Sequence, residues 1–133
     1  MFWNGWLTTV VIAIAKFWQT LKKSLNNMVA LKIKITKFIS DDQPGIVECT
    51  FNDAWHQLHI VQDKVPVVTE KYLDANSEYP QDGVIACEII KEWKNPKGEK
   101  IITVNTSRPW SVDTIDGLTE FDLFEEQLVQ LLR

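Results

Sequence analysis

The sequence lacks the short motifs by which many enzymes are recognised. It contains no phosphate-binding glycine loop, no Gly-x-Gly-x-x-Gly run and no nucleophile elbow. Neither a Cys-x-x-Cys nor a His-Glu-x-x-His spacing is present to hold zinc. These absences do not exclude an enzyme, but none of the residues points to one, and we predict neither a cofactor nor a metal site.

Cysteine is also scarce, since the chain of 133 residues has only Cys49 and Cys87. Two cysteines form at most one disulfide, far below the density of small secreted scaffolds, so we expect a reducing, cytoplasmic compartment. Both lie in apolar runs, IVECTF and VIACEII, where a free cysteine usually packs as a small apolar side chain. We therefore predict that both are inert core residues.

Acidic residues are missing from the first 27 positions and abundant afterwards. Residues 1–27 have a net charge of +3, whereas the rest of the chain combines 11 basic with 18 acidic residues and has a net charge of −7. A surface of that sign repels phosphate backbones, so nucleic-acid binding is disfavoured. The change in charge divides the chain into an N-terminal segment, 1–27, and a main domain, 28–133.

The N-terminal segment has apolar residues at helical spacing, which predicts an amphipathic helix. Its uncharged stretch is short for a membrane-spanning helix, which needs roughly 20 apolar residues. Three uses stay open: contact with the inner face of a membrane, as an anchor or along its surface; packing on the domain or on a second copy in a homodimer; or a translation start at Met28 that leaves 1–27 outside the protein.

From Met28 onward the apolar residues alternate with polar ones, as in half-buried strands. The predicted strands 46–51 and 55–61 should form a hairpin joined at 52–54, with Leu58 and Ile60 facing inward. Pro66 restricts its segment to a sheet edge or a bulge, because proline has no N–H to donate to a ladder. The predicted strands are residues 29–39, 46–51, 55–61, 84–93 and 100–106, with a further extended piece at 64–68.

The final stretch, LTEFDLFEEQLVQLLR, returns to helical spacing. Phe121, Phe124 and Leu128 belong to an apolar stripe, and acidic residues crowd the first turns, where a helix dipole favours them. We therefore predict a mainly β (α+β) fold: a small antiparallel β-barrel or strongly curved sheet of about six strands with a C-terminal helix. Small barrels of the OB or SH3-like sort fit this pattern, but such folds serve unrelated functions.

The two histidines, His56 and His59, do not suggest a metal centre. Residues three apart on a strand point to opposite faces, so these side chains could not share one ion. Cysteine catalysis would need a thiolate beside a histidine in an electropositive setting, which the neighbours of Cys49 do not supply. His56, beside the predicted turn, either meets Cys49 or faces solvent, and we keep it as a candidate binding residue.

Two longer connections could carry a binding function. The loop 105–117 holds Arg108 and Trp110, residue types that dominate interface hot spots, although Trp110 could instead fold over the core and Arg108 pair with an acid. Residues 69–83 are long for a plain loop, so we expect a helical turn or a packed excursion that Tyr72 and Tyr79 help to hold.

The leading hypothesis from the sequence is a non-catalytic binding module that engages a protein partner. An acidic inhibitor or adaptor of the immunity-protein sort fits that description, held at a membrane surface if residues 1–27 serve as an anchor. The alternative is a small-molecule-binding barrel, or a minor hydrolase, with a pocket under residues 69–83. The candidate binding residues are Arg108, Trp110, His56, Tyr72 and Tyr79.

Overall fold

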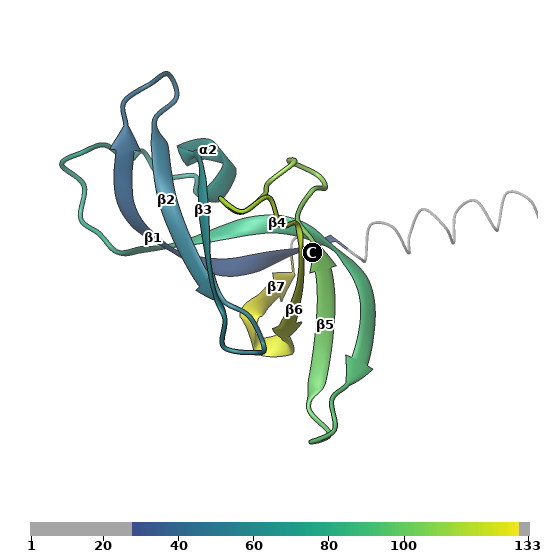
Figure 1. Ribbon diagram of the computed structural model, residues 1–133. Helices are drawn as coiled ribbons and strands as arrows, with labels where there is room; N and C mark the ends of the chain where they lie inside the picture. The colour runs from purple at the N-terminus through teal and green to yellow at the C-terminus, as the bar shows by residue number, and fades with distance from the viewer. Residues whose placement is uncertain (1–27, 131–133) are drawn as a thin grey trace, which may run out of the picture.

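The computed structural model describes residues 28–130, which form a curled antiparallel sheet (Figure 1). The predicted N-terminal helix, 1–27, and residues 131–133 lie outside this range. In chain order the elements are β1 (Met28–Ser40), β2 (Ile46–Asn52), β3 (Leu58–Lys64), α2 (Val65–Val68), β4 (Gln81–Lys94), β5 (Lys100–Asn105), β6 (Glu120–Phe124), the 3-10 turn η1 (Glu125–Gln127) and β7 (Leu128–Gln130).

Six strands lie in the order β3-β2-β1-β4-β5-β6, and β7 pairs with β1 beside that path. The long strand β1 pairs with three neighbours, because its first part pairs with β4 and β7 and its last part with β2. Two bulges interrupt the β1–β2 ladder, and bulges increase the local bend and twist of a strand. The sheet therefore curls into a half-barrel, which confirms the predicted mainly β fold with a strongly curved antiparallel sheet.

The core fills the inside of this half-barrel. The alternating residues Leu31, Ile33 and Ile35 of β1 point into it and are nearly inaccessible to solvent. Cys49 and Cys87 are fully buried, as the sequence predicted. Burial raises the pKa of each thiol to about 12, and for Cys49 the charges of Asp63 and Glu48 add to this effect.

The predicted C-terminal helix is wrong for residues 118–130, which form β6, η1 and β7 instead. In β6 the buried side chains are Phe121 and Leu123, at the period-two spacing of a strand, while Phe124 is only half-buried. The ladder with β5 explains the outcome, because pairing along β6 satisfies its backbone and buries Leu123. Tertiary pairing here outweighs the helical spacing of the apolar residues.

The β2–β3 hairpin exists as predicted, but its turn is longer and the inward face of β3 is the opposite one. The connection runs over residues 53–57, and β3 begins at Leu58, paired with Asn52. His59 and Val61 point inward, whereas Leu58 is 56% exposed. Directly opposed residues of paired strands share a face, so the pairing of Cys49 with Val61 and of Phe51 with His59 puts the odd-numbered residues of β3 inward.

Residues 65–68 form the one-turn helix α2 in place of the predicted extended piece. Pro66 lies in its first turn, where a helix does not need the missing N–H, so proline favours the turn instead of a sheet edge. Residues 69–80, after α2, contain no helical turn; they form the packed excursion instead, with Leu73 buried in the core and Tyr79 packed against it. Within residues 28–130, no helix has the length and apolar character needed to cross a membrane.

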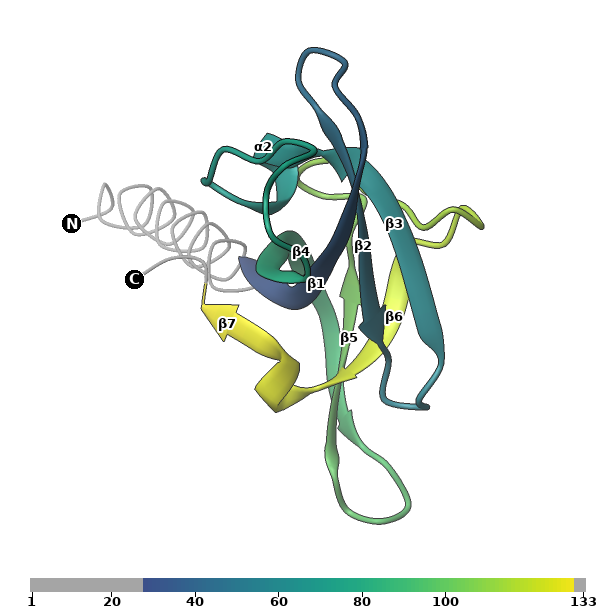
Figure 2. The ribbon, with the colours of Figure 1, turned by 90° about the vertical axis from the view of Figure 1, so that its left-hand side faces the viewer.

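The turns place two hairpins at opposite ends of the sheet. The β1–β2 hairpin extends from one end and the β4–β5 hairpin from the other (Figure 2). In the β4–β5 turn, the side-chain oxygen of Asn95 accepts the N–H groups of Lys97 and Glu99, and Gly98 has a positive φ of 82°. The string KNPKGE thus forms a turn held by the Asn95 side chain, and this turn ends β4.

The strand assignment of β6 can be tested by comparing Leu123→Ala with Phe124→Ala. Leu123 is fully buried, so its truncation should lower the free energy of unfolding by about 2–5 kcal/mol. Phe124→Ala should cost less, although it removes a larger side chain, because Phe124 is half-buried. Urea unfolding of both variants provides the comparison, and a larger loss for Phe124→Ala would favour the helical spacing over the strand.

Candidate functional site

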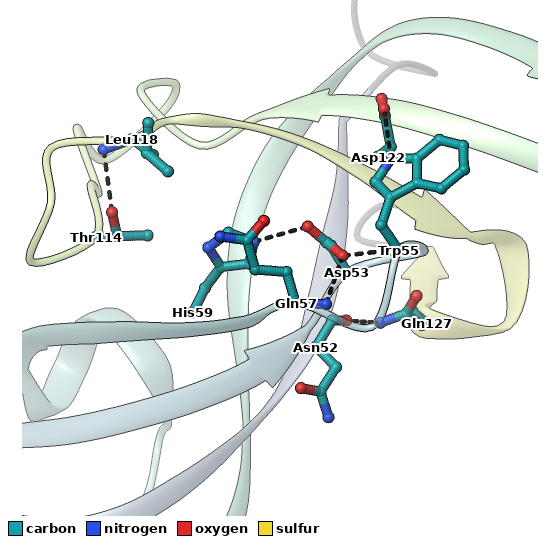
Figure 3. Close-up of polar contacts among 9 residues, drawn as sticks. All are labelled: Asn52, Asp53, Trp55, Gln57, His59, Thr114, Leu118, Asp122 and Gln127. Atoms are coloured by element: carbon teal, nitrogen blue, oxygen red, sulfur yellow. Dashed lines mark hydrogen bonds and ion pairs between the residues drawn. The ribbon is translucent and has the colours of Figure 1, made fainter.

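The turn 53–57, at the end of the β2–β3 hairpin, is organised by one carboxylate. Oδ1 of Asp53 accepts the backbone N–H groups of Trp55 at 2.8 Å and Gln57 at 3.0 Å (Figure 3). The backbone of the turn adds two bonds, from His56 N–H to the Asp53 carbonyl and from Asp53 N–H to the Gln57 carbonyl, both 3.0 Å long. An aspartate favours such turns because its side chain replaces a backbone acceptor.

The second oxygen of this carboxylate faces the protein interior. Oδ2 of Asp53 lies 2.8 Å from Nε2 of His59, and both side chains are buried. The His59 ring packs against Phe51 and Phe121, with centroid distances of 5.2 and 4.9 Å. Burial alone would raise the pKa of Asp53, but hydrogen bonds from His59, Gln57 and Trp55 overcome that effect and hold its pKa below the ordinary value of 3.8.

Strand β6 holds the same turn from the side. The backbone N–H of Ala54 donates to the Asp122 carbonyl at 2.8 Å, and the Trp55 indole Nε1–H donates to Asp122 Oδ2 at 3.1 Å. The other oxygen of Asp122 accepts the Thr103 hydroxyl at 2.6 Å, and Thr103 in turn accepts the indole N–H of Trp93 at 3.0 Å. The turn is therefore tied both to its own hairpin and to the opposite edge of the sheet.

The consequence is an exposed indole with a fixed orientation. Trp55 is 54% exposed, although its N–H is bonded to Asp122 and its ring lies 6.2 Å from that of Trp93. His56, the next residue, is exposed and has a positive φ of 63°, a conformation that costs energy outside glycine. The turn thus presents Trp55 and His56 to solvent on a backbone that several hydrogen bonds hold in place.

Hollows flank the Trp55 side chain on two sides. One, of 560 Å³, lies between the turn and the β4–β5 hairpin, and the other, of 330 Å³, lies toward the end of the β5–β6 loop. The first is bordered by His56, Pro96 and Phe124, and the second by Leu118 and Glu120. Because Trp55 borders both hollows, a molecule bound to this face would contact the indole on either side.

The loop 106–119, between β5 and β6, carries Arg108 and Trp110 as exposed residues. Trp110 is 62% exposed, and within residues 28–130 Arg108 forms no ion pair, so neither is folded back as the alternative interpretation supposed. The base of the loop is fixed, because Thr106 bonds to Val112 and Thr119 and the N–H of Ile115 donates to the Ile60 carbonyl at 2.9 Å.

The two predicted tyrosines lie elsewhere and differ from each other. Tyr72 is 85% exposed and borders a third hollow, between residues 41–45 and 69–74. Tyr79 is half-buried against the core, and its hydroxyl donates to the Asp74 carbonyl at 2.8 Å. The structure therefore does not bring the five candidate residues into one site, and Tyr79 holds the 69–80 segment in position.

The site residues that the sequence did not indicate are Asp53, Trp55, His59, Trp93 and Asp122. The string Asn-Asp-Ala-Trp does contain a signal for the turn, since an aspartate two residues before Trp55 can accept its N–H. The bond from Trp55 to Asp122 joins residues 67 positions apart and has no local signature. An exposed tryptophan also contradicts the general expectation that large aromatics are buried.

Two further observations bear on the function of this site: the arrangement of metal-ligating side chains and the comparison with known proteins. In the part of the chain that the structure describes, no group of three or more His, Cys, Asp or Glu side chains is arranged to hold a metal ion. Comparison of the chain with family models, curated protein sequences and solved structures finds no match among any of them. The functional conclusion must therefore rest on the geometry.

The role of Asp53 can be tested by replacing it with alanine. Because the substitution leaves buried donors without their acceptor, we expect the free energy of unfolding to fall by about 1–3 kcal/mol at pH 7. The pKa of Asp53 is lowered in the folded protein, so its contribution is complete above about pH 4 and is lost as the pH falls below 3.8. The difference between wild type and Asp53→Ala should therefore shrink in acid.

Chemical unfolding at several pH values measures this difference. Asp116→Ala, at an exposed position in the β5–β6 loop, is the matched control and should change stability little at any pH. A difference between wild type and Asp53→Ala that grows as the pH falls would contradict the assigned role.

Proposed function

We propose that this protein is a non-catalytic binding module that engages a protein partner through the face around Trp55. The observation that carries the proposal is that Trp55 is half exposed and yet held by a hydrogen bond and by contact with Trp93. The bond to Asp122 ties the turn to β6 and also fixes the indole in an exposed orientation. Tryptophan is among the residues most enriched at interface hot spots.

Rigidity makes this indole effective as an anchor. Binding costs free energy when a side chain loses rotational freedom, and a side chain already fixed in the free protein avoids much of that cost. The hollows beside Trp55 provide space for apolar groups of a partner, while Lys97, Glu99 and Glu120 supply polar groups at the border. An aromatic centre with a polar rim is the usual anatomy of a protein interface.

Arg108 and Trp110 remain predicted contact residues of the same module. Near the end of their loop, Leu118 borders one hollow beside Trp55, so a partner on that face could extend along the loop. Trp110 is exposed to a similar degree as Trp55, but within the described residues its indole N–H has no hydrogen-bond partner. We therefore assign it a smaller share of the binding energy.

The environments of the nucleophilic side chains support a non-catalytic role. Cys49 and Cys87 are fully buried with pKa values near 12, so almost no thiolate exists at neutral pH. Asp53 is committed to His59 and to two backbone N–H groups of its own turn. We keep two proposals made from the sequence: residues 1–27 contact a membrane, and the protein lies in the cytoplasm.

The test begins with the native partner. The full chain, carrying a photo-crosslinking amino acid in place of His56, is irradiated in cells of its source, and the cross-linked protein is identified and purified. Titration of that protein then compares wild type with Trp55→Ala and with the matched control Trp110→Ala. We expect Trp55→Ala to raise Kd by roughly 30-fold or more, as for a hot-spot residue, and Trp110→Ala to raise it less.

Two outcomes would count against the proposal. A Kd for Trp55→Ala close to the wild-type value, with unchanged thermal stability, would remove Trp55 as the anchor. Cross-linking only to another copy of the chain would indicate that this face forms a homodimer and does not bind a separate protein. Circular dichroism of both variants establishes that any loss of binding does not come from unfolding.

A further inference from the structure

A third hollow, separate from the Trp55 face, lies near the β1–β2 end of the sheet. It has a volume of 650 Å³ and is bounded on one side by residues 41–45 and on the other by residues 69–74. Its apolar lining includes Phe38, Val65 and Leu73, of which the last two are buried. This volume is within the range of about 300–1,000 Å³ typical of small-molecule sites.

Both walls of this cleft are fixed in the free protein. The N–H of Val65 donates to the Gly45 carbonyl at 2.9 Å, which joins α2 to the loop 41–45. On the other wall, Oδ1 of Asp74 accepts the N–H of Asn76 at 2.9 Å, while the Asp74 carbonyl accepts the Tyr79 hydroxyl. One end of each wall, at Gly45 and at Asp74, is therefore held in place before a ligand binds.

The rim of the cleft has a strong excess of negative charge. Asp41, Asp42, Glu70 and Asp74 border it, against the single cation Lys71. In residues 28–130, none of these four carboxylates forms a salt bridge. Like charges gathered around an apolar floor repel one another and attract a cation with an apolar body.

We propose that this cleft binds a small organic cation, a primary amine or guanidinium attached to an apolar group. The apolar group lies on Phe38 and Leu73, and the cation faces the carboxylates of the rim. The exposed ring of Tyr72 borders the same cleft and adds a face over which a cation is attracted. This site is distinct from the Trp55 face and does not depend on the function proposed for it.

Charge decides which ligands the cleft accepts. A carboxylate of the same size would be repelled by the rim, and a neutral alcohol would gain only the contact with the floor. Three of the rim carboxylates are solvent-exposed and Asp74 is half-buried, so each contribution is small, about 2- to 5-fold in affinity, and falls with added salt. Several carboxylates together therefore produce the selectivity for a cation.

The experiment is an NMR titration of the full, ¹⁵N-labelled chain with three probes of matched shape: 4-phenylbutylamine, 4-phenylbutanol and 4-phenylbutyrate. We expect the amine to shift the amide signals of residues 41–45 and 69–74 saturably, the alcohol to bind more weakly, and the carboxylate not to bind. Asp42→Asn and Glu70→Gln should each raise the Kd of the amine by about 2- to 5-fold, and raised salt should have a similar effect.

The controls separate this site from general attraction to an acidic protein. Asp116→Asn removes an exposed carboxylate from the β5–β6 loop and should leave the Kd of the amine unchanged. Equal binding of amine and alcohol, shifts confined to residues outside the cleft, or no saturable shift up to the solubility limit would each overturn the proposal. Because the readout is local to the cleft, loss of partner binding by Trp55→Ala has no bearing on it.

Discussion

The Asp53 carboxylate is the constraint on which the Trp55 face depends. One oxygen fixes the turn 53–57, and the other is bound to His59, whose ring packs between Phe51 and Phe121. Through Ala54 and Trp55, the same turn reaches β6 at the opposite end of the strand order. Burying a carboxylate costs free energy unless several hydrogen-bond donors surround it. The Asp53 carboxylate therefore fixes the turn only while all of its donors are in place.

The half-barrel supports two surfaces of different character. The Trp55 face consists of aromatic groups held by hydrogen bonds, whereas the cleft beside α2 combines an apolar floor with an anionic rim. Both are formed largely by connections between strands: a backbone bond ties the turn 53–57 to β6, and another ties the loop 41–45 to α2. Function carried by loops on a rigid scaffold is common, because the scaffold fixes what the loops present.

Local pattern in the sequence predicted most of the strands but not the contacts that build the site. Alternation identified β1 and the hairpins, because burial of one sheet face imposes period two on each strand. At the C-terminus, Phe121, Phe124 and Leu128 fit a helix equally well, and only pairing with β5 decides between the two. The sequence selected His56 and passed over His59, since Leu58 and Ile60 were assigned to the inward face of β3, whereas pairing with β2 puts His59 opposite the buried Phe51.

The central claim is that the turn holds Trp55 rigid while leaving it exposed. The most direct measurement is the ¹H–¹⁵N heteronuclear NOE of the indole N–H groups of Trp55, Trp93 and Trp110 in the free protein. We predict that the Trp55 indole gives a value equal to that of the backbone amides of β2, like the partly buried Trp93, and that Trp110 gives a lower one. A Trp55 value as low as that of Trp110 would contradict a preformed anchor.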